Sequence, residues 1–328
     1  MIAITGASGL LGSFIASKFV SNGEKIIGLT REKSKALKSD HLRKKINWRE
    51  VNILDPISLS ESLKDVHTVI HSAALVSFNP RRRKEISDAN ATGTKNVVDA
   101  CLAVGVKKLI HISSVAALGQ QKGIYHINED STWVDSALNS DYALSKYQAE
   151  LEVYRGYEEG LQVSILNPSV ILAPSDWNNS SSQIFKYVWN ENAFYTGGTL
   201  NYVDVRDVAN MVYALCTSNF NGERFIASAN YTSLKNIFDE IAKRFNKKSP
   251  SIKVNPALAK LVAHLEAARS FLTKQEPIIT KQTAQTAHTP FYYDNKKAVE
   301  KLKITFQSLE ETLDFCCNYY LQKNTTNK

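Results

Sequence analysis

At 328 residues the chain is long enough for one sizeable core and a smaller second lobe, and its composition, 43% hydrophobic, is ordinary for a globular protein. The spacing of the four cysteines excludes a disulfide framework, the first strand leaves no room for a signal peptide, and no apolar run is long enough to span a bilayer, so we expect a cytoplasmic protein without stable membrane insertion. The net charge of +8 favours anionic partners, small phosphorylated molecules and nucleic acid alike.

The first predicted element is a strand at 2–4, an apolar run without polar alternation, as expected of a parallel strand buried on both faces. A glycine-rich turn and a helical pattern that ends near 22–23 follow at once. Gly6 permits a sharp turn, Gly9 lets the backbone approach a diphosphate, and Gly12 lets the helix lie close to the strand. The context predicts dinucleotide binding rather than an ordinary turn, with cofactor contacts at Gly6, Ser8, Gly9, Leu10, Leu11 and Gly12.

Further strands are predicted at 25–29, 46–51, 68–71, 108–112 and 163–166, with helical patterns between most of them, the clearest at 85–103. This alternation predicts an α/β protein, a Rossmann-type doubly wound parallel sheet with right-handed crossovers. We expect a dinucleotide-binding domain at 1–166, with a return segment at about 200–228. We expect 167–199 and 229–328 to form a smaller, mostly helical C-terminal substrate lobe.

Because ligands of such sheets bind at the carboxyl ends of the strands, the residues just after each strand are candidates. Thr30 stands where NAD-binding proteins usually place an acid, and Arg31 follows it, with Lys35 and Lys38 a turn or two further on. A carboxylate repels a 2′-phosphate, whereas a guanidinium makes a forked contact with it. We therefore expect NADP(H) to be preferred over NAD(H). The alternative is that Arg31 is one more surface cation.

The residues after the third and fourth strands complete the predicted cofactor site. Asn52 and Ile53 are placed to border the adenine. Ser72, Ala73 and Ala74 are small enough for the backbone to pass near the cofactor, although small residues there also suit simple packing.

The densest basic run is Arg81 to Lys84, just after Asn79-Pro80. A solvated loop is favoured over a nucleic-acid patch, because no aromatic residues interleave with the cations as single-strand binders require. A third possibility is that the run borders the substrate entrance. We expect a small-molecule substrate and no nucleic-acid partner.

A helix predicted from Asp141 to about 159 places Tyr142 and Lys146 one turn apart on one face. An ammonium near a phenol lowers the phenol pKa, so that the tyrosine can exchange a proton with a carbonyl or hydroxyl while a nicotinamide cofactor moves a hydride. The hydroxyl of Ser114, just past the fifth strand, would hold the same oxygen. A tyrosine and a lysine four residues apart are often a mere surface pair, but this position in the fold favours an active site.

Together these motifs resemble the extended short-chain dehydrogenase/reductase superfamily, called in full the NAD-dependent epimerase/dehydratase family. The resemblance rests on the opening turn, on Ile112-Ser113-Ser114, on Tyr142-Ala-Leu-Ser-Lys146 and on matches at 69–74, 90–94, 167–170 and 201–208. It implies that Ser114, Tyr142 and Lys146 are the catalytic set.

The resemblance also implies roles around that set. Asn90 would support the site, Lys146 would hold the nicotinamide ribose as well, Pro168 would lie against the nicotinamide, and Ile171 would belong to the cofactor site. Arg31 with Lys38 most resembles the dihydroflavonol reductase-like branch, in which those two positions hold the 2′-phosphate. The superfamily often pairs through helices, so a homodimer is plausible.

Two departures from the family patterns favour a reductase. Ser114-Val115-Ala116 replaces the Thr-Asp-Glu of sugar-nucleotide dehydratases, and Thr30 replaces the acid of sugar epimerases, which retain NAD. Our first hypothesis is an NADP(H)-dependent oxidoreductase, a carbonyl reductase or alcohol dehydrogenase with Tyr142 as acid and base. The alternatives are a nucleotide-sugar epimerase and a non-catalytic cofactor-sensing or RNA-binding protein on the same fold.

In the substrate lobe, Trp177 lies in a polar loop and is either a lid over the substrate or a packed aromatic residue. Helices are predicted at 184–189 and 205–216 and a strand at 224–227. One further helix is expected to be capped by Thr232 and another to be opened by Pro256. Ser308 and Glu311 match a capping box ahead of the last helix.

The seven histidines form no cluster in the sequence. His71 and His111 end predicted strands and are expected to satisfy local hydrogen bonds. Because neither the histidines nor the cysteines have the spacing of a zinc site, no metal is predicted.

Overall fold

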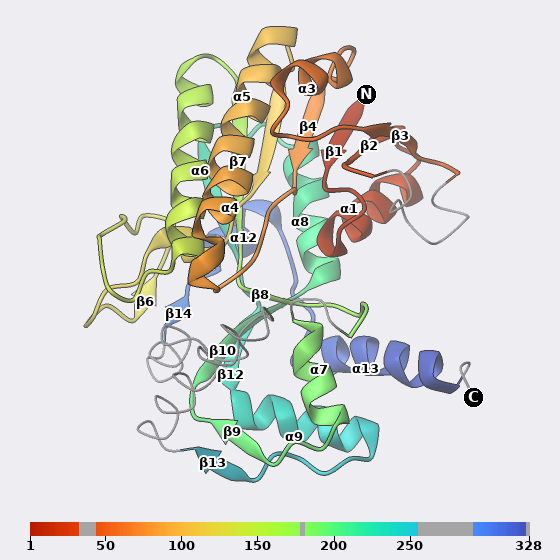
Figure 1. Ribbon diagram of the computed structural model, residues 1–328, viewed down its shortest axis with the longest axis vertical. Coiled ribbons are helices and arrows are strands. Elements are labelled where there is room, and N and C mark those ends of the chain that lie inside the picture. Colours follow the sequence, from red (N-terminus) through yellow and green to blue (C-terminus); the bar gives the residue numbers. More distant parts are fainter. Residues whose placement is uncertain (33–43, 178–180, 255–290, 326–328) are drawn as a thin grey trace.

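The computed structural model describes residues 1–32, 44–177, 181–254 and 291–325. In these residues the largest sheet has seven strands, all parallel to their neighbours, in the order β11-β7-β5-β4-β1-β2-β3 (Figure 1). The strands are β1 (Ile2–Thr5), β2 (Ile26–Thr30), β3 (Asn47–Glu50), β4 (Thr68–His71), β5 (Lys108–Ile112), β7 (Gln162–Pro168) and β11 (Glu223–Ala227). The predicted doubly wound Rossmann-type sheet is confirmed.

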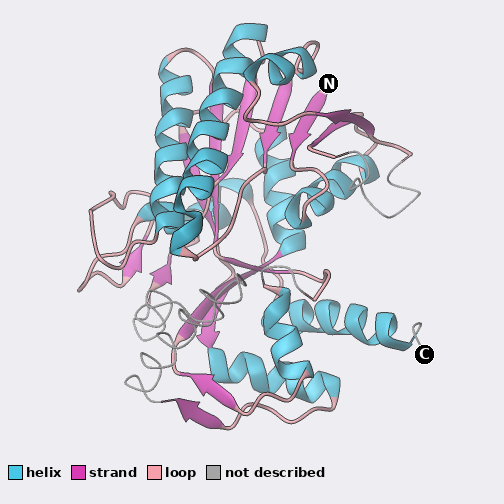
Figure 2. Ribbon diagram, in the orientation of Figure 1, coloured by secondary structure: helices cyan, strands magenta, loops and turns pink. Residues whose placement is uncertain are grey.

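Helices cover both faces of this sheet (Figure 2). On one face lie α3 (Pro56–Ser62), α5 (Gly93–Val104) and α6 (Asp141–Glu158), and on the other α1 (Leu10–Ser21), α8 (Val205–Thr217) and α12 (Lys296–Leu302). Phe19 and Met211 are fully buried in the core under α1 and α8, and Val97 and Val153 in the core under α5 and α6. Because both faces are covered, every residue of β2, β4 and β5 is buried, which is why these strands are apolar runs rather than alternating patterns.

The strands predicted at 68–71 and 108–112 have the observed bounds, and the other predicted strands differ from the observed ones by one or two residues. The helix predicted at 85–103 is divided. It consists of α4 (Arg83–Ser87), a π-helical turn η3 (Asp88–Thr92) and α5. The π-helical turn carries the buried side chain of Asn90 inward.

A smaller lobe lies beyond the carboxyl ends of the main strands (Figure 1). Its helices are α7 (Ser182–Trp189), α9 (Leu234–Phe245) and α13 (Leu309–Thr325). Its short strands are β8 (Val170–Leu172), β10 (Thr199–Asp204) and β12 (Asn230–Ser233) in one sheet, and β9 (Phe194–Thr196) with β13 (Ile252–Val254) in another. A third pair, β6 (His126–Ile127) with β14 (Tyr292–Tyr293), lies at its edge. In the part of the chain that the structure describes, no helix combines the length and the apolar character needed to cross a bilayer.

The aromatic residues of this lobe form its core. Trp177 stacks on Tyr320 with ring centroids 4.2 Å apart, and it also contacts Trp189 and Phe245. The indole therefore packs under α13 and is not among the residues that line the large cavity described below. The packed alternative for Trp177 is confirmed, and the lid is wrong.

Two predicted helix starts have different outcomes. The residue that caps α9 is Ser233, whose hydroxyl accepts from the amide of Asn236, whereas Thr232 lies within strand β12. The prediction of Thr232 as the cap was wrong by one residue, because the pairing with β10 continues through Ser233 and the helix begins only at Leu234. The helix expected from Pro256 lies outside the described residues.

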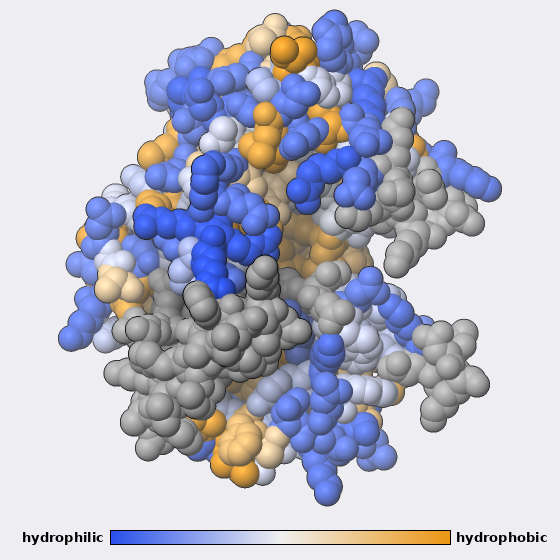
Figure 3. Space-filling view, viewed as in Figure 1, coloured by the Kyte–Doolittle hydropathy of each residue, from blue (hydrophilic) through white to orange (hydrophobic). Residues whose placement is uncertain are grey.

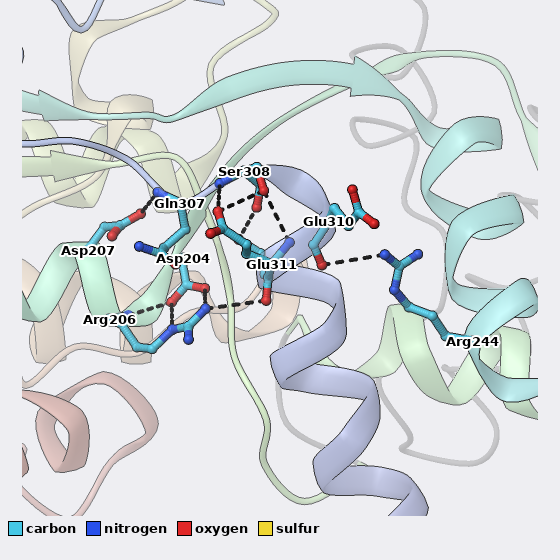
Figure 4. A network of polar contacts seen from close by, with 9 residues as sticks. Asp204, Arg206, Asp207, Arg244, Gln307, Ser308, Glu310 and Glu311 are labelled. Carbon is cyan, nitrogen blue, oxygen red and sulfur yellow. Dashed lines mark hydrogen bonds and ion pairs between the residues drawn. The ribbon is translucent and has the colours of Figure 1, made fainter.

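The capping box at the start of α13 is confirmed and belongs to a polar junction between α13 and α8 (Figure 4). The Glu311 carboxylate accepts from the Ser308 amide at 2.8 Å, and the Glu311 amide donates to the Ser308 hydroxyl at 3.2 Å. Asp207, only 1% exposed, accepts from the Gln307 amide at 2.8 Å. Burial raises the pKa of Asp207 to about 6.

We predict that Asp207→Asn changes how stability depends on pH. Because the native pKa of Asp207 is raised above its unfolded value, the native protein binds this proton more tightly, and the free energy of unfolding falls as pH rises through the interval between the two values. The amide introduced by the substitution does not ionise. Between about pH 4 and about pH 7, the free energy of unfolding of wild type should therefore fall by roughly 2 kcal/mol relative to that of the variant. Urea unfolding at several pH values measures this difference. The matched control is Glu310→Gln, an exposed carboxylate at the same junction, which should follow wild type; parallel curves for wild type and Asp207→Asn would contradict the prediction.

Candidate active site

A cavity of 1280 Å³ opens at the carboxyl ends of the main strands, between the sheet and the smaller lobe. Figure 3 shows hydrophobic residues in the depth of the hollow on this side of the molecule and hydrophilic residues around much of its rim. Every residue that the sequence assigned to the cofactor lines this cavity, except Lys38, which lies outside the described residues. Ser114 also lines it, and Asn90 does not.

The glycine turn between β1 and α1 forms one wall of the cavity. Gly6 has a φ of +67°, and its carbonyl accepts from the Gly9 amide at 2.9 Å. A Cβ at Gly12 would lie 2.1 Å from the Gly6 carbonyl oxygen, and a Cβ at Gly6 would lie 2.9 Å from the backbone of Ala73. The turn is therefore a cradle that only glycine fits, and the amides of the first turn of α1 face the cavity with no side chain capping them.

The cavity wall after β2 contains one residue, Glu32, that the sequence did not assign to the cofactor site. Thr30 is 5% exposed, and its hydroxyl bonds to that of Ser8 at 3.0 Å, so it stays within the wall. Arg31 is exposed and lines the cavity. Glu32 lines the cavity beside it, and we did not predict this residue. In the sequence, the feature that could have identified Glu32 as a lining residue is its position directly after Arg31.

The basic run forms part of the cavity rim. Arg81, Arg82 and Lys84 line the cavity, so the run borders its entrance. Arg82 makes a forked ion pair with Glu85, with nitrogen–oxygen distances of 2.7 and 2.8 Å. The sequence left three alternatives for this run: a solvated loop, a nucleic-acid patch and the border of the substrate entrance. Its position on the cavity rim agrees with the third.

Ser114, Tyr142 and Lys146 meet on the cavity wall, although the serine is far from the other two in the sequence. Ser114 follows β5 and Tyr142 lies in the first turn of α6, and the Ser114 side chain is near enough to the phenol to favour its charged form. Lys146 is 2% exposed, and its ammonium donates to the Ile112 carbonyl at 2.7 Å. The ring of Phe78 meets that of Tyr142 edge-on, with centroids 5.8 Å apart.

The pKa of Tyr142 differs from the sequence-based expectation. Burial raises this pKa, and the Ser114 side chain opposes the rise. We expected Lys146 to lower it, and for the protein without bound ligands this was wrong. The ammonium of Lys146 is directed to the Ile112 carbonyl, so burial dominates. At neutral pH the phenol is therefore protonated.

Asn90 lies behind the cavity wall rather than on it. Its side-chain amide donates to the Leu75 carbonyl and to the Ser145 hydroxyl, both at 2.9 Å, and its oxygen accepts from the Leu75 amide at 2.8 Å. It thus ties the loop after β4 to α6. This is the position of a residue that supports the site without touching a ligand.

The two histidines at the strand ends have different surroundings. His71 bonds to Thr5 at 2.8 Å and to Thr94 at 2.9 Å, as expected. The expectation for His111 was wrong: within the described residues neither of its ring nitrogens has a hydrogen-bond partner, and its ring lies 5.2 Å from that of His71. Burial holds the pKa of both imidazoles below the usual range, so both are neutral.

The far end of the cavity comes from residues that the sequence did not single out. Val76, Phe78, Leu138, Leu200, Phe291 and Tyr293 line it, and they come from four segments that meet only in the folded chain. Gln120 reaches across to the Tyr293 hydroxyl at 3.2 Å. No local pattern marks such residues, because each is an ordinary apolar or aromatic residue in its own segment.

Comparisons with known proteins agree with this arrangement. The chain is 26% identical over 279 residues to sterol demethylase protein B of Methylococcus capsulatus, covering 84% of each protein. It is 25% identical over 317 residues to a protein of Synechocystis named "Putative dihydroflavonol 4-reductase", covering 94% of this chain and 91% of that one. The crystal structure of the UDP-glucose 4-epimerase of Thermotoga maritima shares the fold, with a TM-score of 0.80 at 20% identity over 98% of this chain and 99% of that one. Residues 2–227 match the model of a single family, and the chain therefore belongs to the NAD dependent epimerase/dehydratase family.

Proposed function

We propose that this chain is an NADP(H)-dependent oxidoreductase that reduces a carbonyl group to an alcohol, with Tyr142 as the proton donor. One observation carries the proposal: Ser114, Tyr142 and Lys146 share the wall of the cavity that begins at the glycine turn. A dinucleotide on that turn reaches along the same cavity toward the phenol. The hydride donor, the dinucleotide, and the proton donor, Tyr142, would then lie in the same cavity.

The residues of the cavity fit the cofactor. The glycine turn leaves room for a diphosphate against backbone amides, and Arg31 supplies a guanidinium for a 2′-phosphate. NADPH, when bound, supplies the hydride for the carbonyl carbon. Lys146 is placed to hold the adjoining ribose through its remaining hydrogens, because one is already used by the Ile112 carbonyl.

The protonation state of Tyr142 suits the reductive direction. Because burial raises its pKa, the phenol carries a proton at neutral pH and donates it to the carbonyl oxygen as the alcohol forms. The Ser114 hydroxyl, which lines the cavity with the phenol, holds the same oxygen. Solvent then returns a proton to the tyrosinate that is left behind.

The far end of the cavity supports an uncharged substrate over a nucleotide sugar. The described residues that the smaller lobe contributes there are uncharged, and among them are Val170, Leu200 and Phe291. A sugar nucleotide brings a diphosphate, which calls for cations or free amides at this end. The described cations of the cavity lie instead on the segments after β2 and β4 and on α6. A carbonyl compound with an apolar body is the substrate class that fits.

We predict that Tyr142→Phe lowers kcat by at least about 100-fold while the Kd for NADPH changes by less than about threefold, because the variant loses a proton donor and keeps the ring. Steady-state oxidation of NADPH with a panel of carbonyl compounds gives the first value, and fluorescence titration gives the second. The matched control is Tyr147→Phe on the same helix, whose ring stacks on Trp133 outside the cavity. Undiminished turnover by Tyr142→Phe would refute the assignment.

A second prediction concerns Arg31. Arg31→Gln should raise the Kd for NADPH by about 10-fold to 100-fold and change that for NADH by less than about twofold, because only NADPH carries the 2′-phosphate. Lys64→Gln removes the same charge from an exposed position outside the cavity and should leave both values unchanged. Equal losses for the two cofactors in Arg31→Gln would mean that the guanidinium does not read the 2′-phosphate.

A further inference from the structure

A buried carboxylate lies directly behind the proposed catalytic residues. Glu150 is on α6, one turn after Lys146, and is only 1% exposed. It does not line the cavity. Its oxygen accepts from the Asn167 side-chain amide at 2.6 Å, and the same amide nitrogen donates to the Ser114 carbonyl at 2.9 Å. One amide thus joins Glu150 to the backbone of Ser114.

Two cations flank this carboxylate. The guanidinium of Arg224, on β11, lies 3.4 Å from it and is itself held by the carbonyls of Glu129 and Ser131, both at 2.6 Å. Lys146 precedes Glu150 by one helical turn and therefore shares its face of α6. Burial lowers the pKa of Lys146 to about 8, and the charge of Glu150 opposes this decrease.

The other titratable groups around this pair are nearly all neutral. On β4 and β5, burial holds the pKa values of His71 and His111 below their usual range. On α6, burial raises the pKa values of Tyr142 and Tyr154. The remaining group is the carboxyl of Glu129, which accepts from the backbone on β11 and lies on the Arg224 side.

Burial raises the pKa of Glu150 itself, and Ser113, Arg224, Asn167 and Lys146, in that order, oppose the rise. Arg224 and Lys146 therefore help to keep Glu150 charged. Glu150 in turn helps to keep Lys146 charged. Among the described residues around Lys146, Glu150 is the group whose charge favours the ammonium.

We propose that Glu150 is a positioning residue for the reaction, which keeps the Lys146 ammonium charged at the pH of turnover and, through Asn167, holds Ser114 in place. The inference rests on the proposed function, since it assigns Lys146 and Ser114 to the reaction. It adds a row of buried charged groups, Lys146, Glu150 and Arg224, which runs from the cavity wall to β11 and which we call the relay.

The test compares two substitutions that separate charge from shape. Glu150→Gln keeps the length of the side chain and an oxygen for Asn167 but removes the charge. We expect the alkaline limb of its kcat profile to move to lower pH by roughly one to two units, because a buried lysine that loses its counter-charge releases its proton more readily. Below that limb, the KM for NADPH should stay within about twofold of wild type. Glu150→Asp keeps the charge and should keep the position of the limb, with a lower kcat.

The matched control is Glu158→Gln, at the exposed end of the same helix, which should reproduce the wild-type profile. Melting temperatures of all variants establish that each is folded. If Glu150→Gln keeps the wild-type limb, or if Glu150→Asp shifts it as far as Glu150→Gln does, the inference is overturned.

A second variant tests the relay without altering Glu150. Arg224→Gln removes a cation that opposes the protonation of Glu150, so less of the carboxylate stays charged and the alkaline limb should move to lower pH, by less than in Glu150→Gln. An unchanged limb, or one at higher pH, contradicts the relay. If Tyr142→Phe loses turnover while Glu150→Gln keeps the wild-type profile, only the inference fails. If Tyr142→Phe retains turnover, the proposed function fails and the inference falls with it.

Discussion

The site depends on one close approach of backbone to backbone at the start of the chain. α1 lies so near the first turn that a Cβ at Gly12 would meet the Gly6 carbonyl oxygen at 2.1 Å. On its other side, Gly6 presses against Ala73 in the loop after β4, and the Ala73 amide donates to the Thr5 hydroxyl at 3.1 Å. This contact fixes the glycine turn and the loop that carries Phe78 to the phenol of Tyr142. A side chain at either glycine would separate the two walls of the cavity.

Buried polar side chains connect the glycine turn to helix α6. Thr5 bonds to His71 at 2.8 Å, His71 to Thr94 at 2.9 Å, and the Thr94 hydroxyl donates to the Asn90 carbonyl at 2.6 Å. The Asn90 side chain in turn donates to Ser145, next to the proposed catalytic lysine. Because each of these buried groups has a partner, the network holds the two ends of the site in one geometry. The π-helical turn at η3 places Asn90 where it can take part.

The sequence by itself determined the main sheet, the glycine turn and helix α6. Strands covered on both faces are apolar runs bounded by turn residues, and this pattern located Thr68–His71 and Lys108–Ile112 at their observed bounds. The glycine turn needs no distant partner to be recognised, because its spacing encodes its own backbone geometry. Helix starts are also local, so Asp141 and the capping box at Ser308 and Glu311 were predicted correctly.

Only the tertiary structure decided what these elements face. Trp177 packs on Tyr320 rather than covering the cavity, and no pattern near Trp177 contains that information. The same holds for the raised pKa of Tyr142, because desolvation depends on the segments that close over the ring. It holds also for Glu150, whose partners Asn167 and Arg224 come from two other strands. Periodicity and turn chemistry are properties of neighbouring residues, whereas burial and pairing arise only when distant segments meet, and the chemistry of this site depends on burial and pairing.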